Sequence, residues 1–457
     1  MVPARATQMV QPRRGRIKIM VFKSVAAVLS CSGRRKEKDK ETLAAPLSST
    51  SRQKYGEVSN KLLLSHSADS EVAKGKTVAA MSFQLLTKAR KRTVFSYLLS
   101  RAFSHRSERA CRPTFGIAFD IDGVLLLGNS PVGGSPGALK RLYDADGKLK
   151  IPYVFLTNGG GYPEAKRAFE LSKLLGINVT PSQVLQGHSP FKQLVKRFEN
   201  DLIVAVGKGE PAAVMTEYGF RYVLSIDEYA SCFENIDPLA PYKKWTTKLA
   251  VTQNAKFNES VPRNDVFSKR VQAAFVVSDP VDWSRDIQVL CDILKTGGLP
   301  GRNVGPQPHI YFANDDLEYQ TKFPSERLGM GAFRIALESI FNRIHPQSLE
   351  YTSFGKPHPS VFKNAEILLE KLVASLYDDF YDINHDNTSY FKTLYMIGDN
   401  PAVDIKGARQ TGHPWFSILT RTGVFKGKEN HDKFSADLVV DTVEEAVDYI
   451  LTKECAS

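Results

Sequence analysis

Two aspartates separated by a single residue, Asp120 and Asp122, follow an apolar run and precede a glycine. The run Phe115–Phe119 is short and apolar, which predicts a buried β-strand. Paired carboxylates at the tip of a strand repel each other and need a cation or a proton to coexist. The pair therefore predicts a site that binds a metal through oxygen ligands and also carries a nucleophile.

A second apolar run, Ile151–Leu156, ends in Thr157, Asn158 and three glycines, Gly159–Gly161. A hydroxyl, an amide and a flexible backbone allow main-chain N–H groups to approach an oxyanion closely. The tip of this predicted strand therefore has the composition of an oxyanion-binding loop.

Two further predicted strands end in charged residues. Leu349–Phe354 leads to Lys356, which the two prolines that follow it, Pro357 and Pro359, hold on a stiff turn. Leu394–Ile397 leads to Asp399 and, five residues later, to Asp404. Taken singly, each tip is equally well explained as an ordinary turn, loop or helix cap.

Together the four tips predict one site. In an open parallel α/β sheet the carboxyl ends of the strands share one edge, and ligands bind there. Four aspartates, a threonine and a lysine would then meet around Mg²⁺ and a phosphate group. Thiols and imidazoles, which softer metals prefer, are absent from these tips. The fold class expected is α/β with a doubly wound parallel sheet.

In this order, the four motifs resemble those of the haloacid dehalogenase (HAD) superfamily of phosphotransferases, over roughly residues 113–445. The resemblance implies a HAD-like Rossmannoid core. The long stretch between Thr157 and Lys356 is similar to the type IIA members, whose α/β cap domain is inserted there. Three segments resemble the cat-eye-syndrome-critical-region protein 5 family, a branch of predicted mitochondrial phosphatases of unassigned substrate: Leu290–Leu294, Phe312–Leu317 and Arg327–Phe333.

The resemblance also implies catalytic roles. Asp120 would attack phosphorus and form an aspartyl phosphate, and Asp122 would act first as general acid and then as general base. Thr157 and the backbone of Asn158 would hold the phosphoryl oxygens. Lys356 would offset charge on the nucleophile and on the phosphate, which agrees with the repulsion that a carboxylate meets at a phosphate dianion.

The metal site implied by the resemblance uses three of these motifs. Asp399 and Asp120 would bind Mg²⁺ together with the main-chain carbonyl of Asp122. Asp404 would occupy a secondary acidic position, acting through a water molecule. Such oxygen ligands suit Mg²⁺, which keeps several of its own waters.

The expected organisation is a leader over 1–110, a first part of the core over 111–200, an inserted α/β cap over 201–347 and a second part of the core over 348–457. Within the cap, Pro241–Lys269 is polar and irregular, which predicts a loop. The polar run Asn314–Asp316 has two interpretations: it selects substrate at the site, or it is a strand-end turn.

Charge is concentrated in the leader. Residues 1–110 contain 23 Lys and Arg against 7 Asp and Glu, whereas the other 347 residues contain 38 against 42. The folded part is therefore slightly acidic, which argues against a nucleic-acid partner. The stretch 81–110 is rich in Arg and Ser and has no acidic residue before Glu108, a pattern typical of a transit peptide. It predicts a mitochondrial protein, with plastid or cytoplasm as alternatives.

Several classes are excluded or left open. Five scattered cysteines argue against a disulfide framework or structural zinc, and no apolar run is long enough for a membrane span. The leading hypothesis is an enzyme, a Mg²⁺-dependent phosphatase whose partner is a small phosphorylated substrate. The alternatives are a phosphotransferase, an enzyme of glycerophospholipid metabolism, and a catalytically idle protein that binds a phosphorylated ligand. A homo-oligomer is compatible with the sequence.

Overall fold

The computed structural model describes residues 112–243, 261–302, 305–377 and 390–455. All of them belong to one compact unit, Val94–Ser457. The leader predicted over 1–110 and the transit segment predicted over 81–110 lie outside the described residues. Among the described helices, none combines the length and the hydropathy that crossing a membrane requires.

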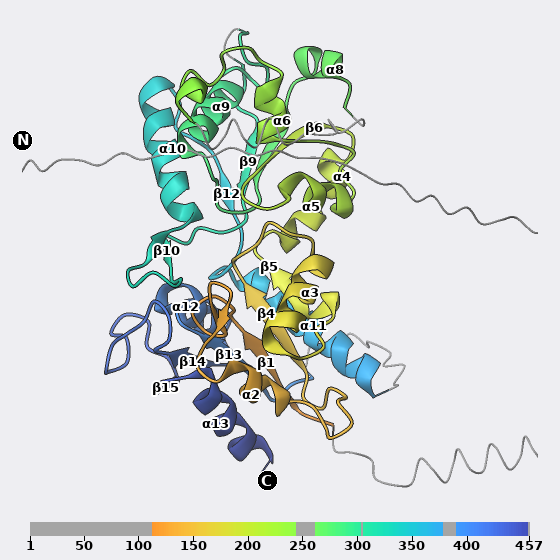
Figure 1. The fold of residues 1–457 in the computed structure, drawn as a ribbon, viewed down its shortest axis with the longest axis vertical. Helices are drawn as coiled ribbons and strands as arrows, with labels where there is room; N and C mark the ends of the chain where they lie inside the picture. Colours follow the sequence, from red (N-terminus) through yellow and green to blue (C-terminus); the bar gives the residue numbers. More distant parts are fainter. Residues whose placement is uncertain (1–111, 244–260, 303–304, 378–389, 456–457) are drawn as a thin grey trace, which may run out of the picture. The chain divides into compact units, whose positions relative to one another are not determined.

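Six parallel strands form what we call the core sheet. Its order places β1 between β13 and β4, so segments from opposite ends of the described chain pair directly, as Phe115 does with Thr393. Figure 1 shows the orange β1 beside the blue β13. In spatial order the strands are β15 (Leu438–Val440), β14 (Trp415–Thr420), β13 (Thr393–Gly398), β1 (Phe115–Phe119), β4 (Tyr153–Thr157) and β5 (Val184–Gln186).

Helices cover both faces of the core sheet, which confirms the doubly wound α/β fold. Alternate side chains of β1 enter two different layers: Ile117 and Phe119 pack in one and Ala118 in the other. This double burial explains why β1 reads as a continuous apolar run. The first layer holds α2 (Ser135–Lys140), α3 (Glu164–Leu175) and α13 (Val443–Cys455), and the second holds α11 (Pro359–Leu376) and α12 (Lys406–Thr411).

Five more parallel strands form a second sheet, which we call the cap sheet. Its order is β12 (Thr352–Ser353), β9 (His309–Phe312), β8 (Ala273–Val276), β6 (Leu202–Val206) and β7 (Tyr222–Ser225). Its helices are α4 (Val195–Phe198), α5 (Pro211–Tyr218), α6 (Ile226–Ser231), α8 (Arg263–Ser268), α9 (Trp283–Lys295) and α10 (Met330–Ile344). The cap sheet has a separate apolar core centred on aromatic residues such as Phe275 and Phe312. The predicted domain boundaries stay predictions.

Short elements complete the fold. Two hairpins pair β2 (Leu126–Leu127) with β3 (Ser130–Pro131) and β10 (Glu318–Tyr319) with β11 (Arg327–Leu328). Short 3-10 helices are η1 (Pro181–Gln183), η2 (Ser189–Leu194) and η3 (Ala240–Tyr242), and η4 (Pro401–Ile405) is a short π-helix.

Two predictions of local structure are corrected. The strand predicted over Leu349–Phe354 belongs to the cap sheet, not to the core sheet, and only Thr352 and Ser353 are paired. Its place follows from β9, whose Phe312 carbonyl accepts a hydrogen bond from the N–H of Phe354. The loop predicted over Pro241–Lys269 overlaps the end of η3 and contains α8, and its residues 244–260 lie outside the described residues.

Candidate active site

Three neighbouring strands of the core sheet end at one edge in polar residues. Asp120 follows β1, Asp399 follows β13, and Thr157 is the last residue of β4. Their strands are adjacent in the order of the sheet, so these residues meet although they are distant in sequence. Asp120 is fixed there because its N–H donates to the carbonyl of Ile397 at 2.9 Å. The predicted shared edge is confirmed for three of the four strands.

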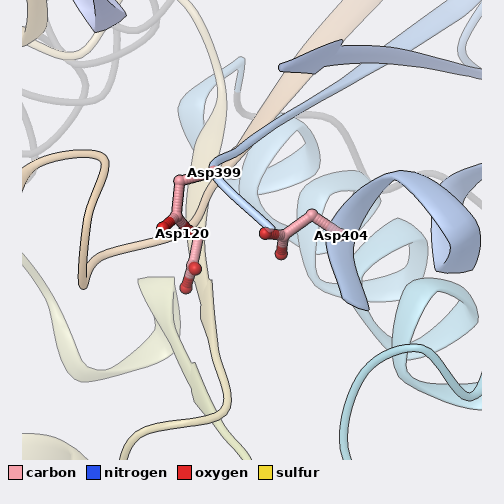
Figure 2. A group of neighbouring side chains, drawn as sticks. All are labelled: Asp120, Asp399 and Asp404. Carbon is pink, nitrogen blue, oxygen red and sulfur yellow. The ribbon is translucent and has the colours of Figure 1, made fainter. Parts of the chain in front are cut away.

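Asp120, Asp399 and Asp404 form a buried group of carboxylates. Each offers one oxygen, and these oxygens lie within 4.8 Å of one another. Figure 2 shows Asp120 and Asp399 close together at the strand ends, with Asp404 directed toward them from η4. Main-chain N–H groups orient two of the carboxylates: Val424 donates to Asp399 Oδ2 at 2.6 Å, and Asn400 donates to Asp404 Oδ2 at 3.0 Å.

Lys356 places one ammonium group against these carboxylates. Its side chain is only 1% exposed, and Nζ lies 2.9 Å from Asp120 Oδ1 and 2.7 Å from Asp404 Oδ1. Burial alone would lower the pKa of Lys356, but the charges of Asp120 and Asp404 raise it, so the ammonium stays charged. The strand before Lys356 belongs to the cap sheet, but the lysine side chain still contacts Asp120 and Asp404 at the edge of the core sheet.

The carboxylates carry more negative charge than one ammonium balances. Burial raises the pKa of Asp120 well above its ordinary value; Lys356 opposes the rise, and Asp404 and Asp399 add to it. Burial and the charge of Asp404 raise the pKa of Asp399 to about 8. A divalent cation would relieve this repulsion, and a donor set made only of carboxylate oxygens suits Mg²⁺. The residues therefore fit the metal that the sequence predicts.

Asp122 lies in the same pocket but outside that carboxylate group. A Cβ atom built on Gly159 would lie 3.0 Å from Asp122 Oδ2, so the carboxylate faces the loop after β4. Removal from water raises the pKa of Asp122, although the charges of Arg167 and Lys208 oppose the rise. A raised pKa favours the protonated form that a general acid needs. The predicted metal contact of Asp122 through its main-chain carbonyl stays a prediction.

Two glycines make room for the Asp399 carboxylate. A Cβ atom would lie 2.3 Å from Asp399 Oδ2 at Gly123, where φ is +88°, and 1.8 Å from it at Gly423. Gly123 belongs to the first motif. Gly423 follows β14, and sequence reasoning does not identify it because a lone glycine in a loop has no informative spacing.

Thr157 and Asn158 are buried at the start of the loop after β4. The N–H of Gly159 donates to Thr157 Oγ1 at 3.0 Å, which tightens the loop. The side chain of Asn158 binds the main chain of Lys356: Oδ1 accepts from its N–H at 2.7 Å, and Nδ2 donates to its carbonyl at 2.9 Å. The structure therefore brings the second and third motifs into direct contact.

A pocket contains every predicted site residue except Asp404, which lies just beneath it against Lys356. Its wall also includes residues at the carboxyl ends of cap-sheet strands, namely Lys208 after β6, Asp279 after β8, and Asn314 and Asp316 after β9. The strand-end argument used for the core sheet also finds these residues when it is applied to the cap sheet.

The cap wall of the pocket is polar and carries both signs of charge. Lys208 Nζ lies 2.7 Å from Asp279 Oδ2 and 5.4 Å from the centre of the Tyr319 ring. Burial lowers the pKa of Lys208, but the charge of Asp279 outweighs it and raises the pKa. The Asp316 N–H donates to Asn314 Oδ1, as expected of a strand-end turn, and both residues also line the pocket. Selection of substrate by these residues stays a prediction.

Comparisons with known proteins agree with these observations. Residues 117–221 match the family model of haloacid dehalogenase-like hydrolases, and residues 353–446 match a HAD-hydrolase-like model. The first match contains the motifs of Asp120 and Thr157, and the second contains those of Lys356 and Asp399.

Two curated relatives extend the similarity across the cap. The mitochondrial hydrolase YKR070W of Saccharomyces cerevisiae is 32% identical over 351 residues, which cover 74% of this chain and 95% of that protein. A cardiolipin synthase (CMP-forming)/mitochondrial hydrolase fusion protein of Schizosaccharomyces pombe is 34% identical over 342 residues. That alignment covers 74% of this chain but only 53% of the fusion protein, so the chain spans about half of it.

A hypothetical protein of Pyrococcus horikoshii is similar in structure, with 20% identity and a TM-score of 0.46 over 74% of this chain and 99% of that one. On the sequence relationship, this chain belongs to the haloacid dehalogenase-like hydrolases. Its two parallel sheets are the Rossmannoid core and the cap-like second domain of that fold.

Proposed function

We propose that this chain is a Mg²⁺-dependent phosphatase that hydrolyses a small phosphorylated metabolite through an aspartyl phosphate. The observation that carries the proposal is the buried ammonium of Lys356, 2.9 Å from Asp120 and 2.7 Å from Asp404. A carboxylate that attacks a phosphate dianion meets strong repulsion, and a fixed ammonium beside the nucleophile reduces it.

In the first half-reaction, Asp120 attacks phosphorus through a carboxylate oxygen while the bond from phosphorus to the leaving oxygen breaks. Lys356 holds the attacking carboxylate in place. Asp122, whose raised pKa favours the protonated carboxyl, gives its proton to the leaving oxygen, which departs as an alcohol. The Thr157 hydroxyl and the Asn158 main-chain N–H donate to the phosphoryl oxygens.

In the second half-reaction, water attacks phosphorus and Asp122, now a carboxylate, takes its proton. The bond from phosphorus to Asp120 breaks, phosphate leaves, and both aspartates return to their starting protonation states. Asp120, Asp399 and the Asp122 carbonyl would hold Mg²⁺, with Asp404 acting through a water. The bound metal supplies positive charge where the transferring phosphoryl group carries its negative charge.

The cap side of the pocket favours a small substrate over a phosphoprotein. Side chains from both sheets meet around the pocket: Asn158 Nδ2 donates to Asp316 Oδ1 at 2.9 Å, and Lys426 Nζ donates to Gln320 Oε1 at 3.2 Å. A folded phosphoprotein would have to break these contacts to reach Asp120, whereas a small ester would not.

The test is a screen of phosphorylated metabolites with the full chain and Mg²⁺, scored by phosphate release. The best substrate is then followed by rapid quench. We expect a burst of phospho-enzyme in the first turnover. Hydroxylamine should release its phosphate, because it cleaves acyl phosphates, and Asp120→Asn should form no phospho-enzyme. A chain that binds phosphate analogues without turning over any compound would be the catalytically idle binder, and the phosphatase proposal would be wrong.

Addition of an acceptor alcohol distinguishes hydrolysis from transfer. A phosphatase releases inorganic phosphate at the rate of substrate loss, whereas a phosphotransferase gives a phosphorylated alcohol in its place. Including glycerol phosphate headgroups of phospholipids in the screen tests the glycerophospholipid alternative in the same experiment.

We also propose a mitochondrial location and a place in the cat-eye-syndrome-critical-region protein 5 branch. The location is supported by the Arg-rich stretch 81–110, which has no acidic residue before Glu108, and by two relatives named mitochondrial hydrolases. A reporter fused to residues 81–110 should enter mitochondria; a diffuse cytosolic signal would contradict this. The assignment to this branch is based on the three cap segments within Leu290–Phe333. It would be wrong if a phylogenetic tree of the superfamily placed this chain in another branch.

A further inference from the structure

The side chain of Asn158 is a junction between the loop after β4 and two segments that leave the cap sheet. Its Oδ1 accepts from Lys356 N–H at 2.7 Å, and its Nδ2 donates both to the Lys356 carbonyl at 2.9 Å and to Asp316 Oδ1 at 2.9 Å. A carboxamide offers two N–H donors and one carbonyl oxygen. Both donors and the oxygen are therefore occupied.

These partners fix the orientation of the carboxamide. A main-chain N–H can only donate and a main-chain carbonyl can only accept, so Oδ1 must face the N–H of Lys356 and Nδ2 its carbonyl. Rotation of the Asn158 amide by half a turn would break both bonds. The remaining contact of Nδ2, to Asp316 Oδ1, occupies its second N–H and holds the amide group in the same orientation.

Asp316 is itself held firmly by the cap. Its carbonyl accepts from the N–H of Gly331 at 2.8 Å at the start of α10, and its own N–H donates to Asn314 Oδ1 at 3.1 Å. Asn314 also donates through Nδ2 to the carbonyl of Asn158 at 2.9 Å. The cap segment after β9 thus contacts both the side chain and the main chain of Asn158.

The chain segments at this junction are packed without spare room. A Cβ atom at Gly355 would lie 2.7 Å from both Ala313 O and Asn158 Oδ1, and one at Gly187 would lie 2.7 Å from Asn158 O. Real Cβ atoms do not approach so closely, so glycine is required at both positions for the two segments to meet. The contact between Asn158 and the cap is therefore part of the packing of this fold.

We propose that Asp316 is a positioning residue for the reaction: it holds the Asn158 amide, and through it the backbone of Lys356, in the geometry that places the ammonium beside Asp120. The inference rests on the proposed phosphatase function and deepens it, because it makes a cap residue part of the catalytic arrangement. Asp316 acts through Asn158 and need not touch the substrate.

Three variants test the proposal in the full chain. Asp316→Ala removes the acceptor, and we expect kcat to fall about 10- to 100-fold with little change in KM, as small misplacements of catalytic groups do. Asp316→Asn keeps a carbonyl oxygen for Asn158 and should retain most of kcat. Asp315→Ala is the matched control, because Asp315 is 40% exposed, pairs with Arg334 at 2.6 Å and should leave kcat unchanged.

The pattern across substrates distinguishes positioning from substrate contact. Positioning predicts the same fold-loss in Asp316→Ala for 4-nitrophenyl phosphate and for the best metabolite from the screen, since the leaving group is not involved. A loss that depends on the leaving group, or an equal loss in Asp316→Asn, would overturn the proposal. So would a kcat for Asp316→Ala within twofold of the unchanged protein.

A readout without catalysis separates this inference from the proposed function. Hydrogen exchange by mass spectrometry follows the Lys356 N–H, and the peptide is simple to interpret because Pro357 and Pro359 have no N–H. We expect exchange about tenfold faster or more in Asp316→Ala and unchanged in Asp315→Ala. Unchanged exchange in Asp316→Ala would refute the positioning role even if the chain is a phosphatase. Faster exchange in a chain without activity would instead contradict only the proposed function.

Discussion

Replacing Lys356 with methionine should destabilise the protein far more than the loss of one surface lysine. The two ion pairs, at 2.9 and 2.7 Å, correspond to about 6 kcal/mol each at an effective dielectric constant of ~20. Most of this is offset by the cost of burying the charges. Removing one partner of a buried pair leaves carboxylates uncompensated, which costs about 3–5 kcal/mol. We expect Lys356→Met to lose that amount in EDTA at pH 7.5.

The assay is urea unfolding of the full chain, with Lys363→Met as the matched control. Lys363 also has a carboxylate partner, Glu366 at 3.0 Å, but its side chain is 55% exposed, so its loss should cost less than about 1 kcal/mol. Without Lys356 the pKa values of Asp120 and Asp399 rise further, because the charge of Lys356 lowers both. The folded variant then binds protons at higher pH than the unfolded chain does, so its deficit should shrink as the pH falls.

Mg²⁺ provides a second check on the same reasoning. Loss of the Lys356 ammonium leaves the carboxylates more negative, so the variant should bind Mg²⁺ more tightly and gain more stability from it than the unchanged protein does. Saturating Mg²⁺ should therefore reduce the deficit of Lys356→Met but not that of Lys363→Met. If Lys356→Met in EDTA loses less than about 1 kcal/mol at pH 7.5, the Lys356 pairs are not the charge compensation inferred from their distances.

Three other changes have expected outcomes. Gly423→Ala should raise the Mg²⁺ concentration for half-maximal activity at least tenfold, since its Cβ would displace the Asp399 carboxylate. Asp279→Asn should change KM among substrates more than kcat, because Asp279 and its partner Lys208 line the cap wall of the pocket and neither is a residue proposed to act on the phosphoryl group. Burial lowers the pKa of His188 from 6.5 to about 4, so the folded state should lose up to ~3 kcal/mol between those pH values, a loss absent in His188→Gln.

Each of these expectations has a contrary result. If Gly423→Ala needed the same Mg²⁺ concentration for half-maximal activity, the Asp399 carboxylate would not depend on the space that the missing Cβ leaves at Gly423. A uniform loss of kcat in Asp279→Asn would place that residue in the chemical step. The unfolded chain takes up a proton at His188 below pH 6.5, whereas the folded chain does not until about pH 4, so the folded state loses stability as the pH falls between these values. If the free energy of unfolding depended on pH in the same way in the unchanged protein and in His188→Gln, the lowered pKa would be contradicted.

Sequence reasoning found the parts of the site that depend on local pattern. The run Phe115–Phe119 spans the same residues as β1, and Asp399 lies at the predicted strand end, because strands buried on both faces have a distinct apolar signature. Sequence reasoning assigned the strand before Lys356 to the wrong sheet, because the sheet that a strand joins depends on which distant strand lies next to it in the fold. Gly423 was beyond it for a similar reason: its importance arises from close approach to the Asp399 carboxylate in space.

The placement of β12 has a consequence for engineering. The strand that delivers Lys356 is hydrogen-bonded to β9 in the cap sheet, and only two residues separate Ser353 from that lysine. A chimaera that exchanges the cap for a foreign one therefore also replaces the strand pair that holds Lys356 in position. Such a chimaera should gain the substrate selectivity of the foreign cap and keep its turnover only when the foreign protein supplies its own counterparts of both β9 and β12.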